Sequence, residues 1–329
     1  MREAIVRARS VMVNGRRDEE EIARLCRAIP DMPPFEALIT YRDVVRLEAP
    51  HVLAMLPDPA VREKYSTYVE RFTQAPPRRY FTDHNYALKL VPTTNILRRG
   101  DTATVLDAAC GNGFEALFFA LHGKRVYAND VSSARSAIAG ARRDFYRTVL
   151  GERLDLTITC GNAIDLGKTV PPMDVVYVQE AISHIHPAEL FVRQVSECLL
   201  KPAGRFIVCD SNGWNPLTRA RITAHLWRQR RTLRHYVEEH VDPETKLKYL
   251  IAEERLFSPS GISRVLTRAG LSIERLEMSG FVLPPMVRTP ATRPRKLDRV
   301  LGAIPVVRQF GGFYTVVATR PQLPRTAVA

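Results

Sequence analysis

The chain is poor in cysteine and contains no long apolar run. Its five cysteines are scattered and never spaced as CxxC, so we expect neither a disulfide framework nor a metal site. No run of about 18 apolar residues is present to cross a membrane as a helix. The N-terminal residues also lack the apolar centre of a secretory signal. These absences predict a cytoplasmic protein with an ordinary hydrophobic core.

Acidic residues are scarce in only one part of the chain. The whole sequence carries 48 Lys and Arg against 35 Asp and Glu, a net charge of +13. Residues 101–210 carry 11 basic and 13 acidic side chains, whereas residues 211–329 carry 20 and 9. Because the middle of the chain is slightly acidic, a uniformly cationic nucleic-acid-binding protein is disfavoured. The basic excess instead points to a substrate or a docking surface served by the C-terminal third.

The pattern of apolar residues changes at Thr104. Before it, apolar residues recur every three to four positions between prolines, which predicts a mostly helical extension. After it, short strands alternate with helices, which predicts an α/β domain with a doubly wound, mainly parallel sheet. The expected strands are TVLDA, KRVYAND, LDLTITCGNA, MDVVYVQEA, RFIVCDS, LSIERLEMSGF and FYTVVATRP.

The alternation is interrupted after the fifth strand. There the run NPLTRARITAHLWRQRRTLRHYVEEHV places apolar residues on one stripe and arginines on the other faces, which predicts a helix. The stripe consists of Ile222, Leu226, Leu233, Tyr236 and Val237. We therefore divide the chain into a helical N-terminal extension (1–100), a main domain (101–213 and 258–329) and a basic helical insertion (214–257).

The strongest motif is VLDAACGNGF at residues 105–114. An apolar strand runs into Asp107 and a turn of small residues, and a helix opens directly after Gly113. Glycines at 111 and 113 allow close approach of the backbone to a ligand. The third glycine of a dinucleotide-binding motif is replaced by Ala116. Asp107 would repel a pyrophosphate and attract a cationic group, so a dehydrogenase is disfavoured.

Three further strand ends carry groups that suit a nucleoside. Asp130 ends the second strand, where a carboxylate can accept hydrogen bonds from ribose hydroxyls. Asn162 follows the third strand and is either an adenine contact or an ordinary turn residue. Gln179 and Glu180 end the fourth strand. Since ligands of open α/β sheets bind outside the carboxyl ends of the strands, these groups predict a site for a positively charged nucleoside.

The ordered set VLDAACGNG, VYANDVS, GNAIDL, MDVVYVQEAISHIHP, LLKPAGRFIVCDSN and FYTVVATRP resembles the class I, Rossmann-like S-adenosylmethionine-dependent methyltransferases over about residues 80–321. The ending is similar to bacterial members that act on small molecules or glycans. The resemblance implies a seven-stranded sheet whose last strand is antiparallel, and S-adenosyl-L-methionine as the cofactor. It further implies that the cofactor is bound by Asp107, Ala109, Gly111, Gly113, Asp130, Val131, Asn162, Ala163 and Gln179.

Methyl transfer needs alignment of the acceptor and exclusion of water, and it needs a base when the acceptor is a hydroxyl. The candidates for that base follow the fourth and fifth strands, and we favour His184 and Asp210. A histidine before a helix can instead complete a cap. The segment from Tyr80 to His84 often folds over the cofactor in this family. The remaining candidates are Glu180, His186 and Asn212.

We therefore expect an enzyme that methylates a small molecule or a sugar, with O-methylation slightly preferred over N-methylation. An RNA methyltransferase and a non-catalytic, cofactor-binding scaffold remain the alternatives, and the oligomeric state stays open. The arginines of the insertion allow three interpretations: a solvated helix face, a basic cover for an acidic acceptor, or a membrane-surface contact that reaches a lipid-linked acceptor. They are Arg219, Arg221, Arg228, Arg230, Arg231 and Arg234.

Overall fold

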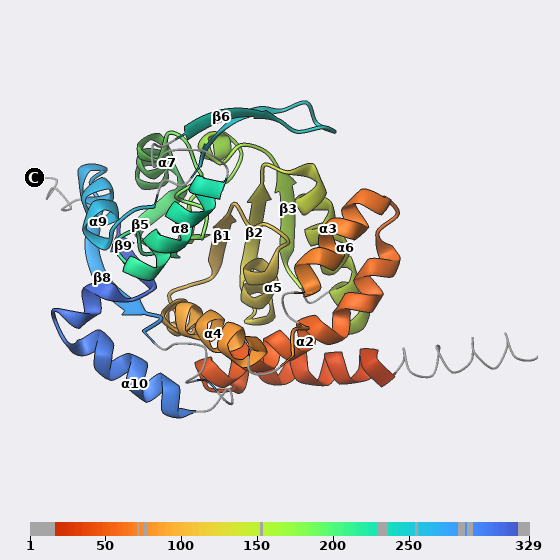
Figure 1. Ribbon diagram of the computed structural model, residues 1–329. Coiled ribbons are helices and arrows are strands. Elements are labelled where there is room, and N and C mark those ends of the chain that lie inside the picture. The colour runs from red at the N-terminus through yellow and green to blue at the C-terminus, as the bar shows by residue number, and fades with distance from the viewer. Residues whose placement is uncertain are drawn as a thin grey trace, which may run out of the picture.

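The computed structural model describes residues 17–70, 73–75, 78–151, 154–228, 236–253, 256–281, 287 and 292–321. A seven-stranded sheet in the order β3-β2-β1-β4-β5-β9-β8 forms its centre (Figure 1). Its strands are β1 (Thr104–Ala108), β2 (Arg125–Asp130), β3 (Leu156–Cys160), β4 (Met173–Gln179), β5 (Leu200–Ser211), β8 (Ser272–Ser279) and β9 (Phe313–Thr319).

The sheet is parallel from β3 to β5, and β9 runs antiparallel to both of its neighbours. This confirms the predicted fold class, including the reversed last strand. Strands β1 and β4 are buried along almost their whole length, as expected for parallel strands covered on both faces. The edge strand β8 is more exposed and carries Glu274, Arg275 and Glu277, charges that discourage pairing with another chain.

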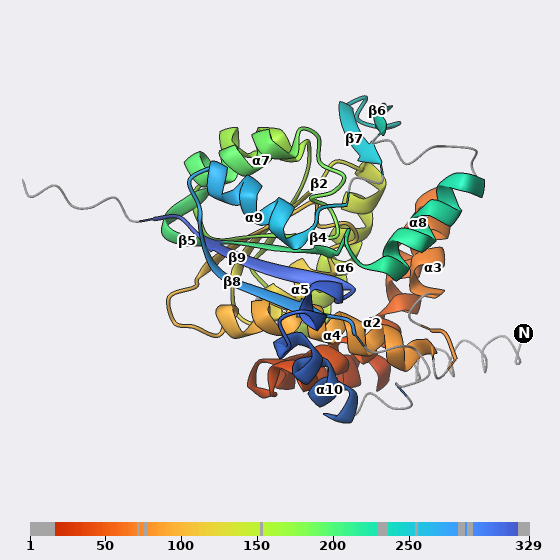
Figure 2. The same ribbon diagram turned by 60° about the vertical axis from the view of Figure 1, so that its left-hand side comes forward.

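Helices cover the sheet in two layers (Figure 2). One face packs against α2, α4, α5 and α6 through a core that includes Phe118 and Tyr146, and the other packs against α7 and α9 around Phe191 and Ile262. The helices are α2 (Pro34–Met55), α3 (Pro59–Glu70), α4 (Arg78–Leu97), α5 (Phe114–Leu121), α6 (Ser133–Leu150), α7 (Ala188–Gln194), α8 (Pro216–Arg228), α9 (Pro259–Arg268) and α10 (Thr292–Ala303). Short helical turns are η1 (Ile29–Asp31), η2 (Ala163–Lys168), η3 (Val195–Leu199) and η5 (Val307–Phe310).

The N-terminal helices are fastened to one another by buried charges. Residues 17–28 are also helical. Asp83 of α4 accepts hydrogen bonds from Arg42 and Arg46 of α2, at 3.0 and 2.5 Å. The side chains of Arg42 and Asp83 are almost fully buried. Because water does not hydrate these charges, they have to pair with each other, and the pair sets the position of α2 relative to α4.

The insertion after β5 differs from the prediction of one long basic helix. Helix α8 ends at Arg228, and the prediction was wrong for Tyr236 and Val237, which lie in the two-stranded antiparallel hairpin of β6 (Tyr236–Val241) and β7 (Lys248–Glu253). The hairpin packs back on the main domain, where Asp242 accepts hydrogen bonds from the backbone amide and hydroxyl of Ser133, both at 2.9 Å. Alternating side chains around the DPETK turn are typical of a hairpin, and the helical stripe concealed this signal.

Within the part of the chain that the structure describes, no helix is both long and apolar enough to span a bilayer. Ser132 caps α6, since its hydroxyl accepts a hydrogen bond from the amide of Arg135 at 3.4 Å. Ser258 caps α9 in the same way. These caps stabilise the first turns of α6 and α9.

Candidate functional site

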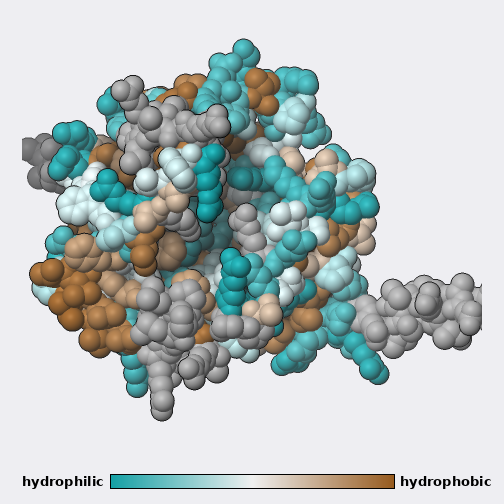
Figure 3. All heavy atoms as spheres, in the orientation of Figure 1, coloured by the Kyte–Doolittle hydropathy of each residue, from teal (hydrophilic) through white to brown (hydrophobic). Residues whose placement is uncertain are grey.

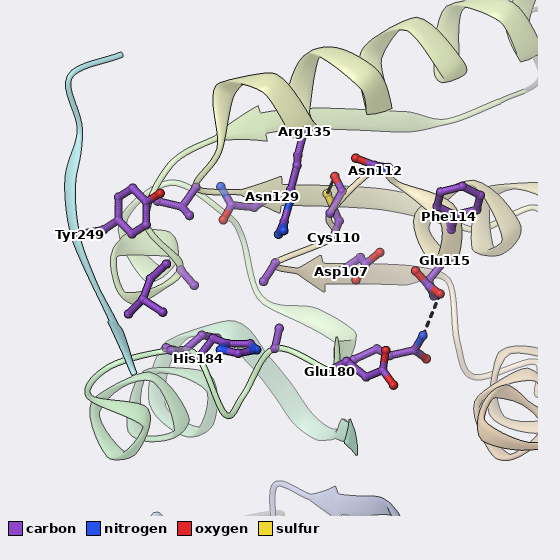
Figure 4. A pocket seen from close by; sticks show the side chains of 18 of the residues that line it. Asp107, Cys110, Asn112, Phe114, Glu115, Asn129, Arg135, Glu180, His184 and Tyr249 are labelled. Atoms are coloured by element: carbon purple, nitrogen blue, oxygen red, sulfur yellow. Dashed lines mark hydrogen bonds between the residues drawn. The ribbon is translucent and has the colours of Figure 1, made fainter. Parts of the chain in front are cut away.

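A cavity of about 950 Å³ opens at the carboxyl ends of β1, β2 and β4 (Figure 4). Its wall comes from six parts of the chain: the turn after β1, the segments after β2, β3 and β4, helix α3, and strand β7 of the hairpin. Of the predicted cofactor-binding residues, seven line it: Asp107, Ala109, Gly111, Val131, Asn162, Ala163 and Gln179. The parallel sheet brings these residues together because the carboxyl ends of its strands meet at one edge.

The turn between β1 and α5 follows an unusual backbone path. Gly111 and Gly113 have φ angles of +56° and +73°, and Ala109 has +58°. A β-carbon on Gly111 would meet no protein atom within 4 Å, whereas one on Gly113 would lie 2.9 Å from the Cβ of Ala139 in α6. Gly111 therefore leaves room for a ligand, and Gly113 leaves room for a helix of the protein. Ala109 adopts a left-handed conformation that costs an alanine free energy.

Buried groups hold the outer side of this turn. Arg142 of α6 donates hydrogen bonds to the carbonyl of Asn112 at 2.8 Å and to Glu48 at 2.5 Å. Tyr41 of α2 donates its hydroxyl proton to the carbonyl of Phe114 at 2.7 Å. The side chains of Arg142 and Glu48 are fully buried. The N-terminal extension thus fixes the carbonyl groups of the turn while its other side faces the cavity.

Asp107 is 2% exposed, lies on the cavity wall, and its Oδ2 has no hydrogen-bond partner among the described residues. Burial raises the pKa of this carboxyl well above its ordinary value, and the negative charges of Glu115 and Asp130 raise it further. A buried carboxylate without a partner is unfavourable. A cation in the cavity would relieve this cost, so the site suits a positively charged ligand.

A second carboxyl group, Glu115 in the first turn of α5, also lines the cavity. Gln179 donates its side-chain amide to Glu115 at 2.9 Å (Figure 4). Burial raises the pKa of Glu115. Beside it, Lys89 of α4 forms an ion pair with Glu180 at 2.7 Å. Glu115 escaped the sequence analysis because it belongs to a helix rather than a strand end.

The structure does not bring Asp130 or Gly113 to the cavity wall. Asp130 is 2% exposed, and its two carboxylate oxygens accept hydrogen bonds from the amides of Gly111 at 2.8 Å and Ser132 at 2.9 Å. Asp130 therefore joins the end of β2 to the glycine turn. Asn162 lines the cavity and also caps η2, since its side chain accepts a hydrogen bond from the amide of Ile164.

His184 lies on the cavity wall opposite the glycine turn. Its Nδ1 is 3.2 Å from the carbonyl oxygen of Ala252 in β7, and the amide of Ala252 donates to the carbonyl of His184 at 3.0 Å. Because a carbonyl can only accept, Nδ1 carries the proton and Nε2 of the neutral ring keeps a lone pair. The hairpin thus sets the tautomer of this histidine.

Asp210 does not line the cavity. It is 2% exposed and accepts hydrogen bonds from the amides of Ser183 at 3.3 Å and Ser211 at 2.7 Å. Burial raises the pKa of Asp210 to about 6. Asp210 therefore holds the turn that precedes His184. Asn212 is also buried and donates to the carbonyl of Gly311 at 2.9 Å, away from the cavity.

Two elements cover the cavity, and one of them was predicted from the sequence. The hairpin belongs to the insertion after β5, for which a cover over the acceptor was one of the three interpretations, whereas α3 was not predicted. Helix α3 contributes Lys64 and Tyr68, and the hairpin contributes Tyr249. The other predicted cover, Tyr80 to His84, instead lies in α4 and supplies no residue to the cavity wall. Nothing in the spacing of residues 59–70 marks α3 as a cover, because its place depends on long-range packing.

The predicted basic cover is described only in part. Arg219 and Arg228 lie in α8 and do not line the cavity. Arg230, Arg231 and Arg234 lie outside the described residues, as does the side chain of Arg221. Among the described residues, no group of three or more His, Cys, Asp or Glu side chains is placed to hold a metal ion.

Comparison with known proteins identifies residues 106–208 as a methyltransferase domain. No curated protein sequence matches the chain. Magnesium protoporphyrin IX methyltransferase of Synechocystis PCC 6803, solved with bound SAH, is 18% identical over 80% of this chain and 100% of its own, with a TM-score of 0.48. An S-adenosylmethionine-dependent methyltransferase of Mesorhizobium loti is 17% identical over 70% and 98% of the two chains, with a TM-score of 0.44. A Haloferax volcanii protein solved with the Trm112 methyltransferase activator is 16% identical over 80% and 99%, with a TM-score of 0.47.

Proposed function

We propose that this chain, whose residues 106–208 match a methyltransferase domain, is a class I S-adenosylmethionine-dependent methyltransferase whose acceptor is a hydroxyl group of a small molecule or a sugar in the cytoplasm. The observation that carries this proposal is the position and tautomer of His184. Its Nδ1 is hydrogen-bonded to the Ala252 carbonyl, which leaves Nε2 of this cavity-wall residue available to an acceptor. A hydroxyl acceptor requires such a base.

The described residues fit the cofactor. The carboxylate of Asp107, whose Oδ2 lacks a partner among the described residues, suits a cationic group, and Gly111 leaves open space beside it. We propose that Asp107, Ala109, Gly111, Val131, Asn162, Ala163 and Gln179 hold S-adenosyl-L-methionine, and that Gly113 and Asp130 shape the turn behind them. When bound, the cofactor supplies an activated methyl group. The chain has to orient the acceptor, exclude water and accept the acceptor's proton.

The two covers favour a small acceptor. Residues of α3 and of β7 line the same cavity as the glycine turn, so an acceptor has to enter between them. His184 accepts the hydroxyl proton at Nε2, and the Ala252 carbonyl stabilises the imidazolium that forms. Asp210 acts as a positioning residue, because it holds the amide of Ser183 beside His184.

The test separates cofactor binding from proton transfer. Wild-type protein and His184→Gln are compared in calorimetric binding of S-adenosylhomocysteine, and in product formation across a panel of phenols, sugars and amines. We expect equal binding of S-adenosylhomocysteine and a loss of turnover of about 10²-fold or more in the variant. Unchanged turnover of a hydroxyl acceptor in His184→Gln, or turnover of amines alone, would overturn the proposal.

A further inference from the structure

Large apolar side chains are exposed on the surface formed by α8, the end of α10 and η5. Five of the six side chains are more than half exposed. The exposed fractions are 80% for Trp227, 70% for Val306, 65% for Leu217, 58% for Val300, 55% for Trp214 and 48% for Phe310. We call this set the docking surface.

Hydrogen bonds join the two parts of the docking surface. The side-chain amide of Asn215 donates to the carbonyl of Phe310 at 2.5 Å, and that of Asn212 donates to the carbonyl of Gln309 at 2.8 Å. Trp214 lies between these two asparagines, so the start of α8 is seated on η5. In Figure 3 brown, apolar atoms gather on the left of the molecule, where Figure 1 places the end of α10.

Helix α8 turns this apolar surface outward. Leu217 and Leu226 are nine residues apart and therefore point to opposite sides of the helix. Leu226 is 2% exposed and packs on the protein, whereas Leu217 is 65% exposed. Trp227 lies about 15 Å along the helix from Leu217. The sequence contains two tryptophans, and both belong to this surface.

Within the two segments that carry the docking surface, the exposed charges are of one sign. Segments 214–228 and 296–310 contain one acidic residue, Asp298, which is 2% exposed and accepts hydrogen bonds from the amides of Gly280 and Phe281. The exposed ionised side chains described in these segments are therefore cationic: Arg219, Arg228, Lys296, Arg299 and Arg308. The partner of this surface should be anionic and should accept aliphatic as well as aromatic side chains.

We propose that the docking surface binds the face of an anionic lipid bilayer. Tryptophan, phenylalanine and aliphatic residues beside arginines are the composition of helices that lie in the membrane interface, and tryptophan is favoured at headgroup depth. Single-stranded nucleic acid also attracts arginine, but its bases stack on aromatic rings and leave no role for Leu217, Val300 and Val306. The surface lies outside the residues that line the cavity, so this proposal stands independently of the acceptor.

The two tryptophans allow a test without a label. Their fluorescence is measured while the full-length protein is titrated with vesicles of phosphatidylcholine, with or without phosphatidylglycerol. We expect a blue shift with the anionic vesicles that is weak with the neutral ones and is reversed by high salt. The variants Trp214→Phe and Trp227→Phe report which tryptophan enters the interface.

Matched variants distinguish binding by the docking surface from nonspecific binding of the protein to vesicles. The double variant Arg219→Gln with Arg228→Gln should weaken binding to anionic vesicles by about fivefold for each charge removed. The control double variant Lys168→Gln with Arg193→Gln removes exposed charges on η2 and α7 and should not weaken binding. Leu217→Ser with Val306→Ser should abolish the blue shift, whereas Leu190→Ser on α7, which is 47% exposed in the wild type, should preserve it. Binding of S-adenosylhomocysteine checks that every variant is folded.

Three results would overturn the proposal. The first is no spectral change with anionic vesicles. The second is an equal loss of binding in the control pair on η2 and α7. The third is tighter binding of a mixed-sequence RNA than of vesicles, with the same arginine dependence, which would assign the surface to nucleic acid.

Discussion

The two glycines of the turn before α5 should respond differently to the same substitution. Gly111 and Gly113 both have positive φ angles, but a Cβ on Gly111 meets open space and a Cβ on Gly113 lies 2.9 Å from the Cβ of Ala139. Alanine in the left-handed region costs about 1–2 kcal/mol, and the stiffer unfolded chain returns about 0.4–1 kcal/mol. Gly111→Ala should therefore destabilise the protein by only about 1 kcal/mol.

Gly113→Ala adds a steric cost to this backbone cost. Ala139 is buried in the middle of α6, and overpacking such a contact typically costs about 1–3 kcal/mol. We expect Gly113→Ala to lower the free energy of unfolding by about 2–4 kcal/mol in all. Ala139→Gly removes the clashing methyl group but costs about 1 kcal/mol of helix propensity. The double variant Gly113→Ala with Ala139→Gly should be more stable than the sum of the two single effects predicts by about 1–3 kcal/mol, because the clash between the two β-carbons is gone.

Urea denaturation measures these differences through the transition midpoint at constant slope. Calorimetric binding of S-adenosylhomocysteine should rank the two variants in the opposite order, with the larger loss of affinity in Gly111→Ala, because Gly111 lines the cavity and Gly113 does not. Gly111→Ala should lose about tenfold or more in affinity while remaining nearly as stable as the wild type. Equal destabilisation by Gly111→Ala and Gly113→Ala, or no rescue by Ala139→Gly, would refute the reasoning.

Three further predictions concern buried charges. Because burial raises the pKa of Asp107 and a bound cation would lower it, binding of S-adenosyl-L-methionine should release protons and tighten as pH rises. Calorimetry in buffers of different ionisation enthalpy measures this, and an equal pH slope in Asp107→Asn would contradict it. Glu48→Leu leaves Arg142 buried without its carboxylate partner and should cost about 3–5 kcal/mol in urea unfolding; Glu48→Leu with Arg142→Met should recover part of that loss. Asp242→Ala removes the contact of the hairpin with Ser133 and should speed amide hydrogen exchange in β6 and β7. An equal effect of Glu244→Ala would show that this contact does not hold the hairpin in place.

Local patterns in the sequence were sufficient for the sheet and for the part of the cavity wall that the strand ends supply. Each parallel strand is a short apolar run bounded by a turn, so β1, β2 and β4 could be assigned without knowledge of their neighbours. Once those strands are parallel, their carboxyl ends meet at one edge, which brings Asp107, Gly111 and Gln179 to one cavity. The same logic does not say which amides will bind a strand-end carboxylate, and the oxygens of Asp130 accept hydrogen bonds from Gly111 and Ser132.

The hairpin illustrates what a local pattern hides. Tyr236 and Val237 continue the helical stripe of α8 in the sequence, yet they pair with β7 in the fold. The contact between Asp242 and Ser133 joins residues 109 positions apart, and no short window of the sequence contains both partners. The tautomer of His184 depends on the same hairpin through Ala252.

By itself, the sequence determined the order of strands and helices, the glycine turn with its acidic neighbour, and hence the kind of cofactor. These properties follow from side-chain periodicity and from backbone conformations that few residues other than glycine readily adopt. Only the tertiary structure decided what covers the cavity and which face of α8 points outward. The physical reason is that burial, ion pairs such as Arg142 with Glu48 and the single sign of charge around Leu217 arise from contacts between distant segments.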